Sequence, residues 1–243
     1  MTYTPESDPM GLAGLDYLQG EKNGKITVRS NIAEDDYIPV KYLFRSFNQM
    51  PALEQKALTL CQGKVLDIGS GVGSHALYLQ EKGLSVDCLD ISPLNNQVAS
   101  QRGVKSTITS DFFSFTSTEK YNTLLLLMNG IGLVGQISKM TAFFDKVKEL
   151  VAPGGQVLMD SSDLRYLYVD EDSYCIPLQD RYYGEVTYNM RYKKAKSKPF
   201  NWLFIDDSLM AQKCTENGFS FEKIAEGVHY DYLARLSIKQ IAI

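Results

Sequence analysis

Short apolar runs alternate with amphipathic segments between residues 51 and 163. The runs are too uniformly apolar for strands with one solvent-exposed face, and they are typical of a parallel sheet that is buried on both faces. Strands are predicted at 64–68 (KVLDI), 84–92 (LSVDCLDIS), 106–113 (STITSDFF), 121–130 (YNTLLLLMNG) and 156–162 (QVLMDSS). Helices are predicted over 51–60, 74–81, 94–103 and 137–155, the last ended by Pro153-Gly154-Gly155. This alternation predicts an α/β fold with a doubly wound sheet.

The pattern differs on both sides of this region. Residues 9–50 indicate short helices and loops, so 1–50 is expected to be an N-terminal helical segment that acts as a lid. Residues 185–192 and 199–205 read as two strands around a tip, a β-hairpin within an insertion at about 164–206. A helix over 206–218 and a strand pair over 219–238 follow. We therefore expect one domain over 51–243 that carries the inserted hairpin.

A glycine-rich turn follows the first predicted strand. Glycines at 69, 71 and 73 allow positive φ and close approach of a ligand to the main chain. In open parallel sheets, ligands bind at the carboxyl ends of the strands. Dinucleotide enzymes use GxGxxG, but here the sixth position is Ser74 and the spacing is GxGxG. This spacing disfavours a nicotinamide-dependent oxidoreductase, which stays as an alternative.

Polar residues end the next three strands. Asp90 lies about 20 residues beyond the turn, where a carboxylate accepts both hydroxyls of a ribose. Asp111 and Phe112 form an acid–aromatic pair suited to an adenine amino group and ring, or alternatively a strand-end turn. Asn129 ends the fourth strand and is expected to face the same crevice.

Taken together, these motifs resemble the class I S-adenosylmethionine-dependent methyltransferases. The resemblance is close over about 51–163 and looser over 207–243. It implies a Rossmann-like seven-stranded sheet in the order 3-2-1-4-5-7-6, with the last strand antiparallel. It also implies that Gly69 and Gly71 pass under the methionine part of S-adenosyl-L-methionine and that Asn129 lies beneath the sulfonium. The implied cofactor-binding set is Asp67, Gly69, Ser70, Gly71, Gly73, Asp90, Ile91, Asp111, Phe112 and Asn129.

Residues for the methyl acceptor are harder to identify. Asp160 and Ser161 end the fifth strand, where a general base is possible, although caps and turns use the same residue types. Tyr182 and Tyr183 belong to a tyrosine-rich insertion that could enclose a planar or cationic acceptor. We expect no catalytic role for His75 or His229, and the catalytic residue stays unassigned. Arg45 is a candidate partner for the methionine carboxylate, or an ordinary surface arginine.

A basic and aromatic cluster near the hairpin tip raises another class of acceptor. Its members are Arg191, Lys193, Lys194, Lys196, Lys198, Tyr192, Phe200 and Trp202. Such a cluster can bind RNA, but a solvated tip has the same composition. The fourth-strand motif MNGIG lacks the Asn-Pro-Pro-aromatic pattern of enzymes that methylate base amino groups, so nucleic acid is disfavoured. The hairpin could also dock a second subunit.

Charge and cysteine content argue against several kinds of partner and metal site. The 243 residues carry a formal net charge of -4, which disfavours bulk electrostatic binding to nucleic acid or anionic membranes. Cys61, Cys88, Cys175 and Cys214 lie far apart without a CxxC pair, so we expect reduced thiols and no metal site. No secretory signal or membrane-length apolar run is seen, and a cytoplasmic location is expected. The favoured function is methyl transfer to a small molecule; the alternatives are RNA or protein methylation and a non-catalytic module that binds the cofactor.

Overall fold

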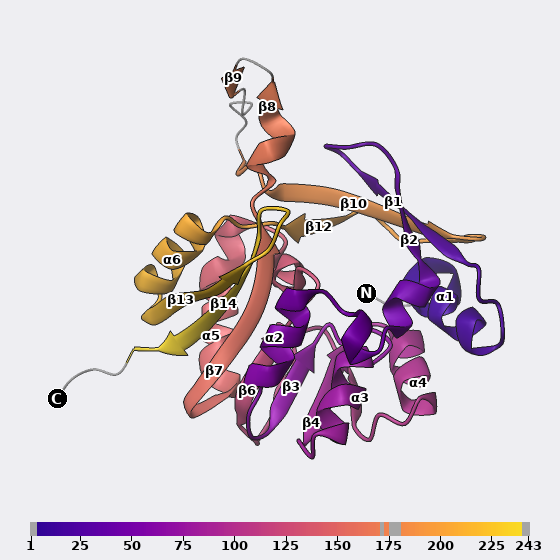
Figure 1. Ribbon diagram of the computed structural model, residues 1–243, viewed down its shortest axis with the longest axis horizontal. Coiled ribbons are helices and arrows are strands. Elements are labelled where there is room, and N and C mark those ends of the chain that lie inside the picture. The colour runs from indigo at the N-terminus through magenta and orange to yellow at the C-terminus, as the bar shows by residue number, and fades with distance from the viewer. Residues whose placement is uncertain (1–3, 171–172, 175–180, 240–243) are drawn as a thin grey trace.

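Seven strands form a mixed sheet at the centre of the molecule (Figure 1). This computed structural model describes residues 4–170, 173–174 and 181–239, and the strands run in the order β5-β4-β3-β6-β7-β14-β13. Strand β14 is antiparallel to β7, whereas β5 to β7 are parallel, so the predicted order 3-2-1-4-5-7-6 is confirmed. The strand bounds are β3 Val65–Ile68, β4 Val86–Asp90, β5 Thr107–Thr109, β6 Tyr121–Leu126, β7 Val151–Ser162, β13 Phe219–Glu226 and β14 Asp231–Ile238.

Helices cover both faces of this sheet, as predicted for a doubly wound fold (Figure 1). One face packs against α2, α3 and α4 through small and branched side chains such as Ala57, Leu79 and Ala99. The other face packs against α5 and α6, where Phe143 and Phe144 lie in the largest apolar cluster. The helix bounds are α2 Ala52–Leu60, α3 Ser74–Glu81, α4 Pro93–Gln101, α5 Met140–Leu150 and α6 Asp207–Glu216.

The end of α5 differs from the predicted end. The α-helix stops at Leu150, and Val151 is extended with φ -76° and ψ 139°. Val151 pairs with Tyr121 of β6, so Pro153-Gly154-Gly155 lies within β7 rather than at the helix end. A β-branched residue with a strand partner fits the pleated sheet better than a last helical turn.

A second, five-stranded sheet lies over the carboxyl ends of the main sheet (Figure 1). The predicted hairpin is present as β10 and β12, which pair from Glu185↔Leu203 to Tyr188↔Phe200. The other edge of β10 pairs with β1, so this edge is occupied by the same chain. We call these strands the roof sheet: β1 Lys25–Ser30, β2 Asp36–Pro39, β10 Glu185–Tyr192, β11 Ala195–Lys196 and β12 Phe200–Leu203.

Strands β1 and β2 correct the expectation of helices and loops over residues 9–50. Ile26 and Val28 are buried and alternate with more exposed neighbours, which is a strand pattern too short to stand out in the sequence. The pairing that stabilises β1 comes from β10, far along the chain. Local propensity therefore could not reveal it.

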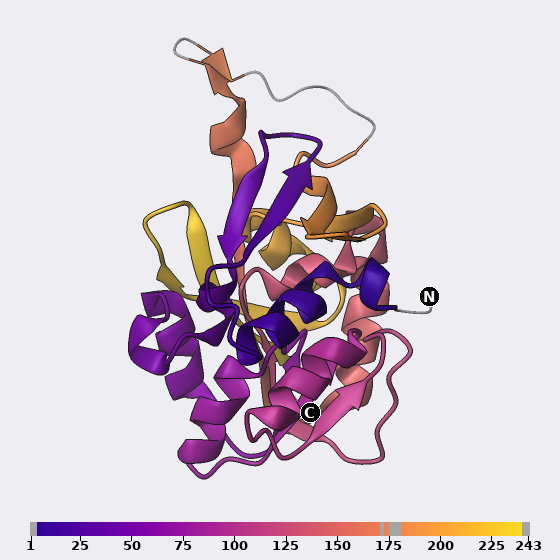
Figure 2. The same cartoon turned by 90° about the vertical axis from the view of Figure 1, so that its right-hand side faces the viewer.

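Helix α1 (Pro9–Leu18) lies between the roof sheet and α4 (Figure 2). Its glycines allow close contact: a methyl group on Gly11 would meet Leu94 Cβ at 2.5 Å, and one on Gly14 would meet Val72 Cγ1 at 2.9 Å. The N-terminal segment is thus fixed against the glycine turn and the start of α4. The remaining short elements are the two-residue strands β8 Val169–Asp170 and β9 Ser173–Tyr174 and the 3-10 helices η1 Pro5–Ser7, η2 Val40–Phe44, η3 Phe47–Gln49, η4 Gly130–Val134, η5 Ile137–Lys139 and η6 Leu164–Tyr168.

Candidate active site

The glycine turn leaves an open cradle at the carboxyl end of β3. Gly69 and Gly71 have φ of 71° and 55°, and a methyl group built on either one meets no atom within 4 Å. Gly73, with φ 81°, differs because the same methyl would lie 2.7 Å from Val104. The main chain at 69 and 71 therefore borders free space, whereas Gly73 serves the close packing of α3.

Asp90 fixes this turn to the next strand. Its Oδ2 accepts a hydrogen bond from the Gly71 N–H at 2.8 Å, and its Oδ1 accepts one from the Ser92 N–H at 2.8 Å. Burial raises the pKa of Asp90, and the two N–H donors oppose that rise. The neighbouring Ile91 is 40% exposed, unusual for an isoleucine beside a buried strand end. A carboxylate and an apolar side chain thus stand together beside the cradle.

The acid–aromatic pair lies at the end of β5. Asp111 is exposed, and its Oδ1 accepts from the Phe113 N–H at 2.9 Å. The ring of Phe112 is only 6% exposed and packs against Phe143 at a centroid distance of 5.8 Å. Any contact of Phe112 with an adenine would therefore use its main chain or its remaining exposed edge.

Asn129 links three segments at the end of β6. Its N–H donates to Asp160 Oδ1 at 2.8 Å, its Nδ2 donates to the Leu203 carbonyl at 3.2 Å, and its Oδ1 accepts from Ser161 Oγ at 3.0 Å. The Ser161 hydroxyl also accepts from the Ile205 N–H at 3.0 Å. The side chains of Asn129 and Ser161 are thus used to join β6, β7 and the end of the roof hairpin.

Tyr182 and Tyr183 lie at the base of the insertion. The Tyr182 hydroxyl donates to Asp206 Oδ2 at 2.6 Å, and the Tyr183 hydroxyl donates to Asp163 Oδ1 at 2.8 Å. Burial raises the pKa of both phenols, that of Tyr183 to about 12, so both stay protonated at neutral pH. The two rings, 4.4 Å apart between centroids, form a fixed aromatic wall between β7 and α6.

Sequence reasoning considered Arg45 and His75 separately but missed Glu54, which joins them in a buried charged cluster beside the cradle. Arg45 Nη2 donates to both carboxylate oxygens of Glu54, at 3.0 and 2.9 Å, and Glu54 Oε2 lies 2.9 Å from His75 Nε2. The side chains of Arg45 and Glu54 are 7% and 5% exposed. The available signal was Glu54 itself, which shares the buried face of α2 with Ala57 and Leu58.

Several polar atoms in this region are buried without a hydrogen-bond partner. Among the described residues they include Arg45 Nε and Nη1, Asp67 Oδ2 and Ser70 Oγ. Buried polar groups are nearly always paired, because an unpaired one costs about 1–3 kcal/mol. Their concentration around one turn indicates a polar ligand site.

The buried acids of this region have shifted pKa values. Burial raises the pKa of Asp67 to about 6, against the opposing effect of His75. Burial, with the charge of Glu54, raises the pKa of Asp160 to about 7. Burial opposes the charged form of His75, but the hydrogen bond to Glu54 and the charge of Asp67 outweigh it and raise its pKa. Shifted acids gathered at a strand edge are typical of functional sites.

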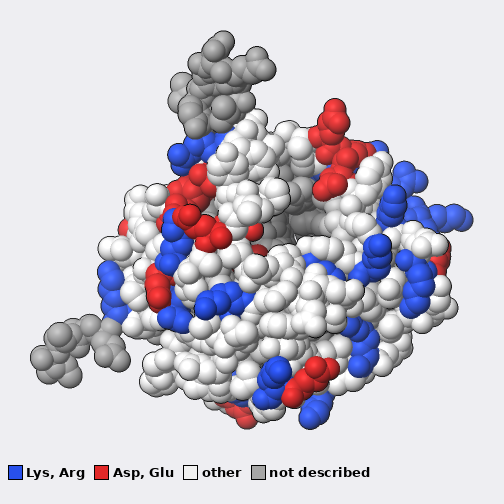
Figure 3. All heavy atoms as spheres, in the orientation of Figure 1, with Lys and Arg blue, Asp and Glu red and all other residues white. Residues whose placement is uncertain are grey.

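The roof sheet bounds a hollow above this edge, visible in the space-filling view below β10 and beside α1 (Figure 3). Two residues at the basic tip of the roof sheet make contacts within the chain. Lys193 Nζ lies 2.6 Å from Asp16 Oδ2 and also contacts Glu21. Tyr192 is buried, with only 3% of its surface exposed. One of the lysines considered for RNA binding therefore holds the roof to the α1 segment.

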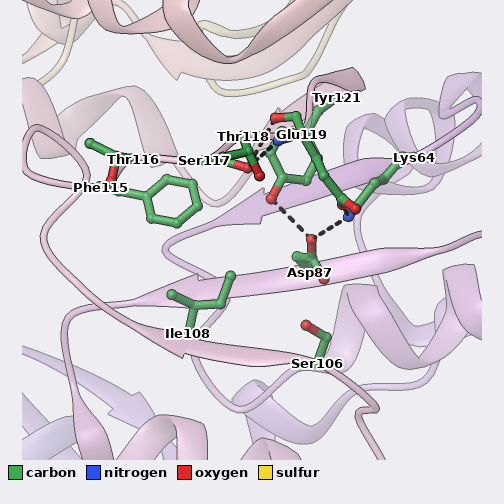
Figure 4. A pocket seen from close by; sticks show the side chains of 10 residues that line it. All are labelled: Lys64, Asp87, Ser106, Ile108, Phe115, Thr116, Ser117, Thr118, Glu119 and Tyr121. Carbon is green, nitrogen blue, oxygen red and sulfur yellow. Dashed lines mark hydrogen bonds and ion pairs between the residues drawn. The ribbon is translucent and has the colours of Figure 1, made fainter.

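A second depression, of about 610 Å³, lies at the opposite edge of the sheet (Figure 4). Its charged groups satisfy one another: Asp87 Oδ2 accepts from the Tyr121 hydroxyl at 2.9 Å and pairs with Lys64 Nζ at 3.0 Å. It lies at the amino ends of the strands, away from the edge where open parallel sheets bind ligands. The cradle is therefore the stronger candidate.

Among the described residues, the cysteines and the other possible metal ligands form no second functional site. Cys61, Cys88 and Cys214 are free thiols, and burial raises the pKa of Cys61 to about 12; Cys175 lies outside the described residues. Across the described ranges, no three His, Cys, Asp or Glu residues gather in a way that could hold a metal ion. In the same ranges, every helix is too short or too polar to cross a bilayer.

Comparison with known proteins agrees with this geometry. Residues 41–220 match a family model described as a methyltransferase domain. A solved SAM-dependent methyltransferase from Bacteroides fragilis, in complex with S-adenosyl-L-homocysteine, is 45% identical, with 99% of this chain and 98% of that chain covered and a TM-score of 0.92.

More distant structures share the fold. The CcbJ methyltransferase from Streptomyces caelestis is 11% identical, with 80% of this chain and 95% of that chain covered and a TM-score of 0.61. DesVI from Streptomyces venezuelae is 15% identical, with 77% of this chain and 91% of that chain covered and a TM-score of 0.56. No curated protein matches the chain. The family model and the Bacteroides fragilis structure show that the chain belongs to the class I S-adenosylmethionine-dependent methyltransferases.

Proposed function

We propose that this methyltransferase acts on a small-molecule acceptor that enters the hollow beneath the roof sheet. The observation that carries the proposal is the roof itself: β1, β10 and β12 lie over the carboxyl ends of the main sheet. Lys193 holds this roof against the α1 segment through Asp16. A covered hollow suits a compact acceptor better than an extended polymer.

The cradle fits the cofactor that the family uses. Open space beside Gly69 and Gly71 can receive an extended ligand against bare main chain. The unpaired Nη1 of Arg45 is a charged donor suited to a carboxylate, so we assign the methionine carboxylate to Arg45. We assign the ribose to Asp90, and the adenine to the space near Ile91, Asp111 and Phe112. The complete proposed set is Asp67, Gly69, Ser70, Gly71, Gly73, Asp90, Ile91, Asp111, Phe112 and Asn129, with Arg45 added.

The cofactor supplies a methyl group on a positively charged sulfur, which needs little further activation. The chain's own residues then hold donor and acceptor in line and exclude water, and such positioning contributes several kcal/mol to catalysis. We propose that residues 1–50 and the insertion 164–206 form one lid unit for this purpose, since β1 and β10 pair within the roof sheet. The Tyr182–Tyr183 wall lies at the base of that unit.

The test follows a radiolabelled methyl group from S-adenosylmethionine into fractions of a cell extract. The predicted result is label in the metabolite fraction and none above background in the protein and RNA fractions. Asp90→Asn is the control, because loss of the ribose contact should remove labelling in proportion to lost cofactor affinity. Label in RNA or protein would overturn the small-molecule acceptor while leaving the family assignment intact.

A further inference from the structure

Asp160 lies near the carboxyl end of β7 and beside the end of β6. Its Oδ1 accepts from the Asn129 N–H at 2.8 Å, and the Gly130 N–H also hydrogen-bonds to this carboxyl. Two backbone donors therefore fix the carboxylate, which stays partly exposed.

The backbone that holds Asp160 adopts an uncommon conformation. Met128 and Asn129 are consecutive non-glycine residues with φ of 61° and 55°. Each residue in the left-handed region costs of order 1 kcal/mol, and such strain is concentrated at functional sites. Here it directs the Asn129 N–H at Asp160 and leaves the Met128 side chain 40% exposed beside Arg45.

The Asp160 carboxylate itself favours a cation as its ligand. Besides burial, the charge of Glu54 on α2 raises the pKa of Asp160, and His75 on α3, which bonds to Glu54, lowers it. The charges of Arg45 and Glu54 offset each other in their ion pair. A carboxylate acceptor would be repelled by the Asp160 carboxylate, and a hydroxyl is too weak an acid to give its proton readily to a carboxylate.

We propose that Asp160 faces the methyl acceptor and that the acceptor is a protonated amine. This inference rests on the proposed function and names its substrate class. The partly exposed Asp160 carboxylate pairs with the ammonium and positions its nitrogen. The shifted titration of the Asp160 carboxyl, close to neutrality, suits a group that binds a cation and takes a proton from it.

In the proposed step, the ammonium first gives one proton to the Asp160 carboxylate. The freed nitrogen lone pair forms a bond to the methyl carbon, while the electrons of the broken sulfur–carbon bond stay on sulfur. The nitrogen gains the positive charge that the sulfur loses, which leaves a methylated ammonium and a neutral thioether. Asp160 then releases its proton to solvent, which restores the carboxylate.

Sinefungin tests this proposal without knowledge of the acceptor. This cofactor analogue carries an amine where the cofactor carries its methyl group, so it places an ammonium at the acceptor side. Calorimetry compares its affinity with that of S-adenosylhomocysteine. In the wild-type protein at about pH 8, sinefungin should bind about tenfold or more tightly, the effect of a charge-assisted hydrogen bond. Asp160→Asn should remove this preference, and exposed Glu119→Gln should keep it.

The pH dependence of the ratio between the sinefungin and S-adenosylhomocysteine affinities gives a second test, which uses the wild-type protein alone. The preference for sinefungin should grow as pH rises through about 7, where Asp160 ionises. Equal affinities at all pH values, or a preference that survives in Asp160→Asn, would overturn the amine proposal. Failure of S-adenosylhomocysteine itself to bind the folded wild-type protein would instead refute the proposed cofactor site.

Discussion

Arg45 and Glu54 form a buried ion pair through a single guanidinium nitrogen. Nη2 of Arg45 contacts both carboxylate oxygens, at 3.0 and 2.9 Å, while Nε and Nη1 are buried without a partner. The guanidinium carbon also lies 3.4 Å from the centre of the Tyr42 ring. This arrangement fixes the side chain and leaves Nη1 as a charged donor for a ligand.

Replacing Arg45 with lysine should weaken binding of S-adenosylhomocysteine by about tenfold. Lysine keeps the charge that Glu54 needs, but its single ammonium cannot bond to both Glu54 oxygens and also hold a fixed N–H donor toward the ligand carboxylate. Isothermal titration measures the loss. The matched ligand is 5′-methylthioadenosine, which lacks the amino-acid part and should bind both proteins equally. An equal loss for both ligands would show that Arg45 serves only the fold.

Alanine at Gly69 should mainly lower ligand affinity, whereas alanine at Gly73 should mainly lower stability. Both positions have positive φ, so each variant carries a backbone cost of about 1–2 kcal/mol. The added methyl at 69 enters the open cradle and should lower affinity for S-adenosylhomocysteine. At 73 it would lie 2.7 Å from Val104, so it should mainly lower the melting temperature. Wild-type affinity in Gly69→Ala would place the ligand elsewhere.

Asp67→Asn should stabilise the free protein at alkaline pH. The folded-state pKa of Asp67 is raised to about 6, mainly by burial, so the folded state binds the proton more tightly than the unfolded chain. Stability from this group is complete below about pH 4 and is lost as pH rises toward 6 and beyond. Urea unfolding should give a variant more stable by about 1–3 kcal/mol at pH 8, and no difference at pH 4. A pH-independent difference would contradict this account.

The cofactor half of the site was accessible from sequence because it depends on local order along the chain. The spacing of Gly69, Gly71 and Asp90 fixes a turn and a strand-end acid, and α3 begins and ends at the predicted residues. Parallel strands bring such ends together whatever the rest of the chain does. The strand order was predicted from the family resemblance, and the structure confirms it.

The acceptor half was less accessible because it depends on contacts between distant segments. Pairing of β1 with β10 builds the roof, and neither strand signals its partner. Glu54, His75 and Arg45 come from separate elements, and only folding shows that they form one cluster. Tyr182 and Tyr183 were singled out by composition, but their bonds to Asp206 and Asp163 needed the tertiary structure.

A crystal structure with S-adenosylhomocysteine bound tests the central claim most directly. The account predicts the amino-acid part along the main chain of Gly69 and Gly71, its carboxylate on Arg45 Nη1, and both ribose hydroxyls within about 3 Å of Asp90. Side chains filling the space beside Gly69 and Gly71, or a nucleoside bound away from Asp90, would contradict it.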